Sequence, residues 1–383
     1  MNSRRPAPAR RDLLLAMAVF AAINFSLVAL NGVRYGGDTP LYLEGAGRLI
    51  DGRPLVDRQP SYTGYVVVVA AAQAMGIGTL GVVAIQVLVG AAVAALVFKI
   101  GAGLAGRPAG AVAAALYSVD VDTNRWHQFI LADSIYVSAF VAAVWLTHRA
   151  TITRGIEPPL SALSVTLAAA LVRPEGWFLL PAVIGYLIVM RPWSMPQQLA
   201  SAGATAVVVS VLLWALSSNY HGNMQAVGPA SMLQRGQTIW DYDGWRVTMP
   251  ASEATHGDQA GGAIGYALRH PVSTIELMVA RVAVHFAHVR PFYSTPHNVV
   301  IVLWLVPLYA AALWALWRLG LTPLAVWIAA AIATQTAVVA LTHAEWDGRY
   351  LAHVLPLIDP LAGAGVVMAF GSFAALRGAA PRG

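Results

Sequence analysis

Residues 13–30 read LLLAMAVFAAINFSLVAL, an apolar run followed by the polar loop YGGDTPLY at residues 35–42. A run of this length is typical of a helix that crosses a bilayer. The arginine pairs at 4–5 and 10–11 give the N-terminus the look of a signal peptide, but no clear small-residue cleavage site follows. We therefore interpret the run as an uncleaved first transmembrane helix, which places the polar loop at a membrane boundary.

The composition favours a membrane protein throughout. Hydrophobic residues make up 58% of the 383 residues and charged residues only 11%, whereas a soluble domain carries about 25% charged residues. The net charge of +6 comes from scattered arginines without a basic patch, which argues against nucleic-acid binding. The absence of cysteine excludes disulfides and thiol catalysis.

Eleven apolar segments predict an all-α polytopic fold in which residues 1–383 form a single membrane domain. We expect about ten transmembrane helices plus interfacial helices in the outer loops, with 61–77 lying along the outer interface. The segments expected to span are about 12–31, 80–98, 108–120, 131–148, 160–173, 174–190, 197–217, 298–318, 321–342 and 350–375.

The distribution of charge predicts the orientation. With the N-terminal arginines in the cytoplasm, Asp12 and Glu157 are the only ones of the 18 acidic residues on the cytoplasmic side. The remaining acids fall on the outer side, in a first outer loop at 32–79, in a second at 219–297, or at outward-facing helix ends. We therefore expect a multi-pass protein of the cytoplasmic (inner) membrane whose active site faces outside or the periplasm.

The second outer region contains an expected helix from about 272 to 289. Ile275 and Val279 belong to its apolar face, and Arg281 and His285 to its polar side. This pattern is typical of an amphipathic helix on a membrane surface.

Four ordered motifs carry a resemblance to a known superfamily. They are Gly37-Asp38-Thr39-Pro40-Leu41-Tyr42 with Gly52-Arg53-Pro54 and Gln59-Pro60 after it, Leu131-Ala132-Asp133-Ser134-Ile135-Tyr136, Leu171-Val172-Arg173-Pro174-Glu175-Gly176, and Glu345-Trp346-Asp347-Gly348-Arg349-Tyr350. In this order they resemble the glycosyltransferase C superfamily, and within it the protein O-mannosyltransferases and aminoarabinose transferases. One departure is that Asp38 is followed by Thr39, where many members carry an Asp-Glu pair.

The resemblance implies a hexosyl- or pentosyltransferase that moves a sugar from a polyprenyl-phosphate carrier to an acceptor, with inversion. It implies Asp38 as the catalytic base, because the acceptor must lose a proton as the sugar–phosphate bond breaks. The local sequence alone also allows Asp38 to be a helix cap, since Gly-Gly-Asp-Thr-Pro is good turn chemistry. Asp133 also has two interpretations: it caps the next helix, or it faces an acceptor cavity.

Arginines are expected at the phosphate because a guanidinium group can donate hydrogen bonds to two phosphate oxygens at once. Arg349 has Glu345 four residues before it, so an ordinary surface salt bridge is the competing interpretation. Arginines at the interface also snorkel without binding substrate. The complete set of expected substrate-binding residues is Glu44, Arg58, Asp133, Arg173, Arg290, His297, Glu345, Arg349 and Tyr350.

No metal site is expected, because the histidines lack the spacing of a ligand set; a divalent metal cofactor is possible but has no support in the sequence. The expected partners are a polyprenyl-phosphate sugar donor, a lipid, glycan or protein acceptor, and membrane lipids, but no nucleic acid. The main alternative function is a transporter or flippase of a lipid-linked sugar, and a second is a non-catalytic scaffold. A transporter would carry charges near mid-helix, whereas the helix centres here are almost free of them.

Overall fold

The computed structural model describes residues 10–191, 229–250 and 262–378, together with positions 203, 207 and 210. Within these residues the regular elements are helices, and β-pairing is limited to isolated bridges such as that between Arg34 and Phe129. The predicted all-α polytopic fold is confirmed. The expected span at 197–217 lies outside the described residues, apart from the three single positions.

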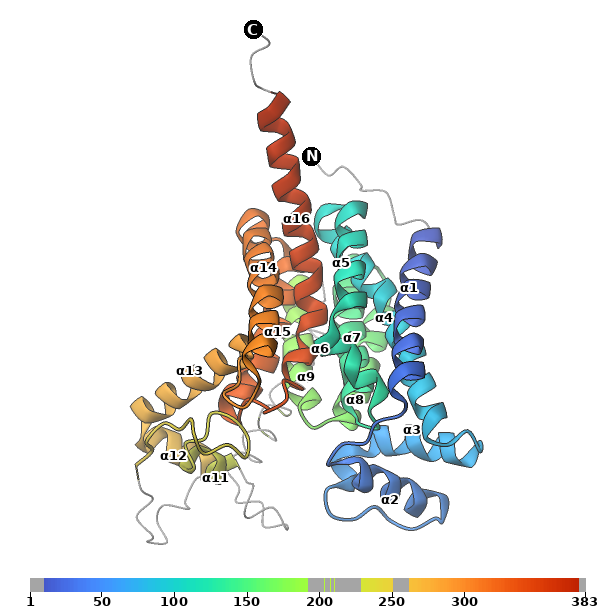
Figure 1. Ribbon diagram of the computed structural model, residues 1–383, viewed down its shortest axis with the longest axis vertical. Helices are drawn as coiled ribbons and strands as arrows, with labels where there is room; N and C mark the ends of the chain where they lie inside the picture. The colour runs from blue at the N-terminus through green and yellow to red at the C-terminus, as the bar shows by residue number, and fades with distance from the viewer. Residues whose placement is uncertain are drawn as a thin grey trace.

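The body of the molecule is a bundle whose helices run along the long axis (Figure 1). Among the described residues, five helices are long and apolar enough to cross a membrane: α1 (Arg10–Asn31), α4 (Gly78–Ala105), α7 (Asp133–Ile152), α14 (Thr295–Leu319) and α15 (Pro323–Leu341). Shorter helices complete the described bundle: α5 (Arg107–Val119), α8 (Glu157–Val172), α9 (Gly176–Met190) and α16 (Leu355–Gly378).

Helices α2 (Thr39–Ile50) and α3 (Thr63–Ala74) lie across one end of this bundle, joined by the short helix η1 (Gln59–Tyr62) (Figure 1). A small apolar core holds them there, with Tyr42 and Tyr65 fully buried in edge-to-face contact. A Cβ added at Gly64 would lie 2.9 Å from the backbone nitrogen of Val172, so glycine allows α3 to press against the end of α8. The crosswise course of α3 agrees with the non-spanning interpretation of 61–77, and its membrane depth stays a prediction.

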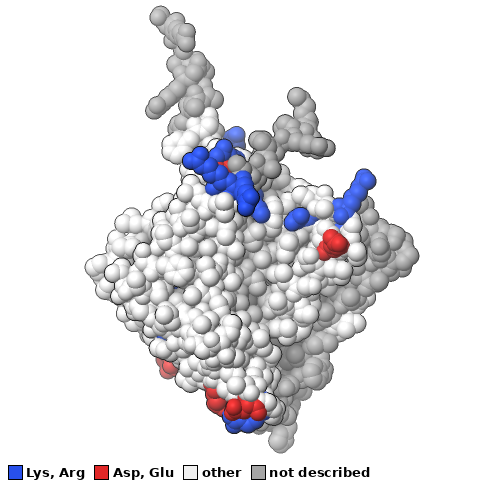
Figure 2. All heavy atoms as spheres, turned by 90° about the vertical axis from the view of Figure 1, so that its right-hand side faces the viewer, with Lys and Arg blue, Asp and Glu red and all other residues white. Residues whose placement is uncertain are grey.

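The two ends of the bundle differ in charge. Figure 2 shows mostly Lys and Arg with a few acidic groups near one end, a broad uncharged band in the middle, and acidic groups with some basic ones at the other end. Arg107 Nη2 pairs with Asp12 Oδ1 at 2.6 Å, which joins the starts of α1 and α5. Arg191 donates to the carbonyl of Ala150 near the end of α7. Arg107 and Arg191 therefore lie at the end of the bundle where α1 begins, the end that the sequence analysis places in the cytoplasm.

The opposite end carries the remaining short elements. They are α6 (Val121–Asn124), η2 (Arg125–Gln128), α11 (Pro229–Gln234), α12 (Gly262–Arg269), α13 (Pro271–Ala287) and η3 (Leu351–His353). Helix α13 matches the expected amphipathic helix: Arg281 and His285 are buried against the protein, while Ile275 and Val279 are exposed. Its apolar side is thus free to contact lipid.

Candidate active site

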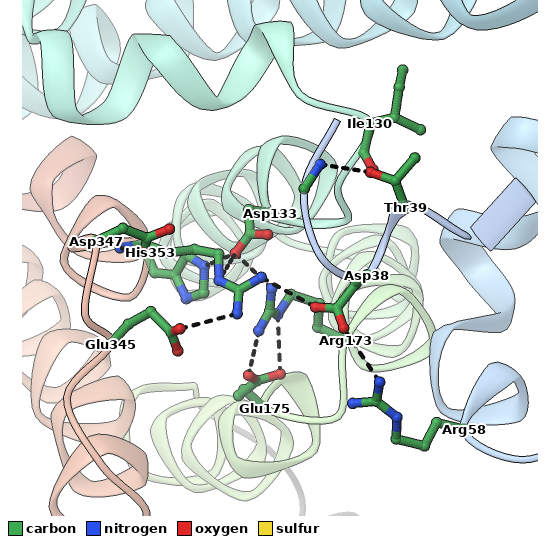
Figure 3. A network of polar contacts seen from close by, with 12 residues as sticks. Asp38, Thr39, Arg58, Ile130, Asp133, Arg173, Glu175, Glu345, Asp347 and His353 are labelled. Atoms are coloured by element: carbon green, nitrogen blue, oxygen red, sulfur yellow. Dashed lines mark hydrogen bonds and ion pairs between the residues drawn. The ribbon is translucent and has the colours of Figure 1, made fainter. Parts of the chain in front are cut away.

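Asp38 stands immediately before α2 and is directed towards two arginines (Figure 3). Its Oδ1 lies 3.4 Å from Arg58 Nη2, and its Oδ2 lies 3.2 Å from Arg349 Nη1. Although Asp38 occupies the N-cap position of α2, its side chain makes no capping hydrogen bond. The carboxylate is 22% exposed, so it is accessible to solvent or to a ligand.

Thr39 fixes the turn in place of a capping aspartate. The backbone N–H of Gly36 donates to Thr39 Oγ1 at 2.8 Å, and that hydroxyl donates to the carbonyl of Ile130 at 2.9 Å. The turn is thereby tied to the segment that leads into α7 (Figure 3). Thr39, which stands where many members of the superfamily carry Glu, thus links the Asp38 turn to the segment before α7.

Asp133 is the first residue of α7 and is completely buried. Arg173 Nη1 donates to its Oδ1 at 2.5 Å, and His353 Nε2 approaches the same oxygen at 2.9 Å. Arg349 Nε lies 3.9 Å from it. Asp133 lies in the first turn of α7, near the positive end of the helix as the capping alternative expected, and its contact with an acceptor stays a prediction. It is the buried counter-charge on which three basic side chains converge.

Arg173 and Glu175 form a fork in the turn between α8 and α9. Arg173 Nε and Nη2 donate to the two oxygens of Glu175 at 3.2 and 2.8 Å. Burial alone would raise the pKa of Glu175, but the Arg173 charge and hydrogen bonds outweigh it and hold the pKa below its usual value. Arg173 is therefore shared between two carboxylates, Asp133 and Glu175.

The loop between α15 and η3 brings Arg349 to this cluster. Glu345 Oε1 lies 3.4 Å from Arg349 Nη2, so the expected pairing of these residues is present. The backbone between them is a turn, in which Gly348 adopts a φ of +77°, and not the helix end expected from sequence. The ring of Tyr350 lies 5.5 and 5.9 Å from the guanidinium carbons of Arg173 and Arg349.

A chain of buried hydrogen bonds leads from Tyr136 through Gln335 and His353 to Asp133. Tyr136 donates to Gln335 Oε1 at 2.9 Å, and Gln335 Nε2 lies 3.0 Å from His353 Nδ1. Because the Gln335 amide donates, His353 Nδ1 accepts and its Nε2–H donates to Asp133. Roles for His353 and Glu175 were not predicted; the signal for Glu175 is its place two residues after Arg173 in the third motif.

Three expected substrate-binding residues lie apart from this network. Glu44 is exposed on α2 and pairs with Arg48 at 3.8 Å. His297 is exposed at the start of α14 and stacks on Tyr293 with ring centroids 4.4 Å apart.

Arg290 also lies apart, with its guanidinium buried and donating to backbone carbonyls, including those of Glu345 and Trp346. It acts as an anchor for the loop that bears Arg349. Substrate contact by Glu44, His297 and Arg290 stays a prediction.

The chemistry of the cluster is that of carboxylates matched to guanidinium groups. Among the described residues, no group of three or more potential ligands is placed to hold a metal ion. The partly exposed members are Asp38, Arg58 and Arg349, with Asp133 and Arg173 buried behind them. Such an arrangement offers one accessible proton acceptor beside fixed positive charge.

Comparison with known proteins supports the resemblance seen in the motifs. Residues 62–226 match the model of the family described as dolichyl-phosphate-mannose-protein mannosyltransferase. No curated protein matches the chain. Among solved structures, the archaeal oligosaccharyltransferase AglB from Archaeoglobus fulgidus, in complex with an inhibitory peptide and a dolichol-phosphate, is similar with a TM-score of 0.55 at 15% identity.

The similarity to AglB covers 97% of this chain and 52% of the AglB chain, so this chain spans about half the length of that protein. At 15% identity it shows a shared fold. Together, the family match and the shared fold confirm the resemblance of this chain to the glycosyltransferase C superfamily of membrane glycosyltransferases.

Proposed function

We propose that the protein transfers a sugar from a polyprenyl-phosphate carrier to an acceptor at the outer surface of a cytoplasmic membrane. The observation that carries the proposal is the position of Asp38: a partly exposed carboxylate between Arg58 and Arg349, at the end of the bundle opposite the cluster of cytoplasmic arginines. The acceptor is a lipid, glycan or protein.

Asp38 acts as the general base in this proposal. Each of its oxygens faces one guanidinium group and retains lone-pair capacity for a hydroxyl proton. The acceptor oxygen attacks the anomeric carbon, its proton passes to Asp38, and the bond from that carbon to the phosphate oxygen breaks. Displacement in one step inverts the anomeric configuration.

The arginines supply the electrostatic part of catalysis. The departing phosphate gains charge as its bond to the sugar breaks, and fixed cations beside it stabilise that change without reorganising. Burial would lower the pKa of Arg349, but the nearby Asp133 and Glu345 carboxylates raise it, so the guanidinium stays charged. Arg58 is half exposed and is the more accessible of the two arginines to an incoming phosphate.

The relatives support a lipid-phosphate substrate without identifying the sugar. The matching family is named for dolichyl-phosphate-mannose, and AglB was solved with a dolichol-phosphate and a peptide. A transporter of a lipid-linked sugar is the second candidate. It is less favoured because the charged network lies at the ends of the spanning helices and not along a route through them.

Lipid analysis tests the substrate class. The full chain, purified in a mild detergent, is extracted and the lipids are identified by mass spectrometry. A polyprenyl phosphate or its sugar ester that is retained by the wild-type protein, and depleted in Arg349→Ala, supports the proposal. Retention of phospholipids alone by both proteins, after exposure to added polyprenyl phosphate, would contradict it.

A further inference from the structure

An aromatic surface lies beside the loop that carries Glu345 and Arg349. We define it as the side chains of Tyr242, Trp245, Phe292 and Trp346. Trp346 is 54% exposed, Phe292 41% and Trp245 38%. Their rings touch in series, with centroids 6.3 Å apart from Trp245 to Tyr242, 5.4 Å from Tyr242 to Phe292 and 5.9 Å from Phe292 to Trp346. Large apolar rings exposed together mark an interaction site.

The backbone beneath the aromatic surface is firmly held. The carbonyl of Trp346 accepts hydrogen bonds from Arg290 Nε and from the Tyr293 hydroxyl, each at 3.2 Å. Arg290 itself is 1% exposed. A Cβ at Gly348 would overlap the His288 ring, so only glycine fits the turn that follows. The exposure of Trp346 is therefore imposed by a fixed loop.

Membrane anchoring alone does not account for the aromatic surface. Aromatic side chains do gather at membrane interfaces, and exposed aliphatic residues of this region lie on α12 and α13, among them Leu268 and Val272, and at the start of α14, at Val299 and Val300. The aromatic surface is also accompanied by exposed charged groups: Asp241, and Asp243 in an ion pair with Arg246. Carboxylates are poor neighbours for hydrocarbon and good ones for water.

Rings flanked by carboxylates match the chemistry of a sugar. The C–H face of a saccharide ring packs on an aromatic ring, and its hydroxyl groups donate to carboxylates. Rigid Trp and Tyr side chains provide such contact at low entropic cost. Trp346 follows Glu345 directly, and Glu345 pairs with the arginine that contacts Asp38. The aromatic surface therefore shares a loop with Arg349, the arginine that contacts the proposed base.

We propose that the aromatic surface binds a saccharide ring of the acceptor, which would make the acceptor a glycan; this rests on the proposed function. We assign the ring to the acceptor because a lipid-linked donor approaches from the bilayer. The charged side chains around the aromatic surface indicate that this surface faces water. Trp346 and Phe292 hold the ring of the acceptor while a neighbouring hydroxyl faces Asp38.

Saturation-transfer NMR on the full chain in phospholipid nanodiscs tests this assignment. The probes are methyl α-D-mannopyranoside, methyl β-D-glucopyranoside and cellobiose. At least one probe should show saturation of its C–H protons with the wild-type protein. Trp346→Ala should reduce that signal by about tenfold, as expected for loss of a central aromatic contact, while Trp346→Phe should retain most of it. Phe292→Ala serves as a second variant should Trp346→Ala fail to fold.

Trp317→Ala is the matched control, since Trp317 is 70% exposed near the other end of α14; it should bind like wild type. Asp38→Asn should also retain saccharide binding, because the assay involves no transfer. If the wild-type protein binds a saccharide but transfers no sugar, the saccharide assignment of the aromatic surface holds and the proposed transferase function is contradicted. Absence of saturation for every probe, equal saturation in Trp346→Ala, or Trp346-dependent saturation of a Ser/Thr-Pro peptide alone would overturn the saccharide assignment.

Discussion

Asp38 and Arg349 are 311 residues apart in the sequence, yet their side chains meet at 3.2 Å between Oδ2 and Nη1. The same arginine reaches towards the buried Asp133 and pairs with Glu345. Arg349 is therefore the side chain that connects the exposed carboxylate to the buried charge network.

Arg349→Lys should weaken donor use more than it weakens the fold. Lysine keeps the positive charge but loses the forked geometry that contacts Asp38 and Glu345 together. We expect KM for the lipid donor to rise about tenfold or more, as for the loss of one charged hydrogen bond, with little change in Tm. A Lys variant with wild-type donor binding would remove Arg349 from the phosphate site.

Asp133→Asn should destabilise the protein. The change removes the buried charge that faces Arg173 and His353, and breaking a buried ion pair costs about 3–5 kcal/mol. Glu44→Gln is the matched control, since Glu44 is exposed and pairs weakly with Arg48. The midpoints of thermal unfolding in the same detergent compare the two. Equal stability of both variants would show that Asp133 is not the centre of a structural network.

We expect the free energy of unfolding to depend on pH through the buried carboxyl group of Asp347. Burial, with the charge of Glu345, raises the pKa of Asp347 to about 6 in the folded protein. Since the folded state then holds a proton that the unfolded state has released, stability falls as pH rises from about 4 to 6. The loss is at most about 3 kcal/mol.

Asp347→Asn should reduce this slope, measured as Tm against pH. An unchanged slope in Asp347→Asn would show that Asp347 titrates normally.

The topology is open to a direct test with reporter fusions. A reporter after Met75, just beyond α3, should lie outside, and one after Lys99, within the last turns of α4, should lie inside. A fusion after Arg154, between α7 and α8, is a control that should also lie inside. The reverse placement of the first two would mean that α3 crosses the membrane.

Sequence was most informative where one short-range pattern decides the outcome. Long apolar runs predicted the helical bundle, and the periodicity near Ile275 predicted α13. The pairing of Arg349 with Glu345 was expected from their four-residue spacing, although the structure forms it across a turn and not along a helix.

The hub at Asp133 was not predictable, because its partners Arg173 and His353 are 40 and 220 residues away. Which loops meet at the end of the bundle depends on helix packing that no local motif encodes. The same holds for Arg290: its residue type suits phosphate, but the fold surrounds its guanidinium with backbone carbonyls.

Transfer by the Asp38→Asn variant tests the central claim most directly. Asparagine keeps the size of the side chain and caps a helix about as well as aspartate, but its amide takes no proton at neutral pH. In membranes supplied with polyprenyl-phosphate sugar donor, we expect a folded variant that still binds the lipid and transfers about 10²–10⁴-fold more slowly. Transfer at the wild-type rate by Asp38→Asn, with the same donor and acceptor, would contradict the assignment of Asp38 as the base.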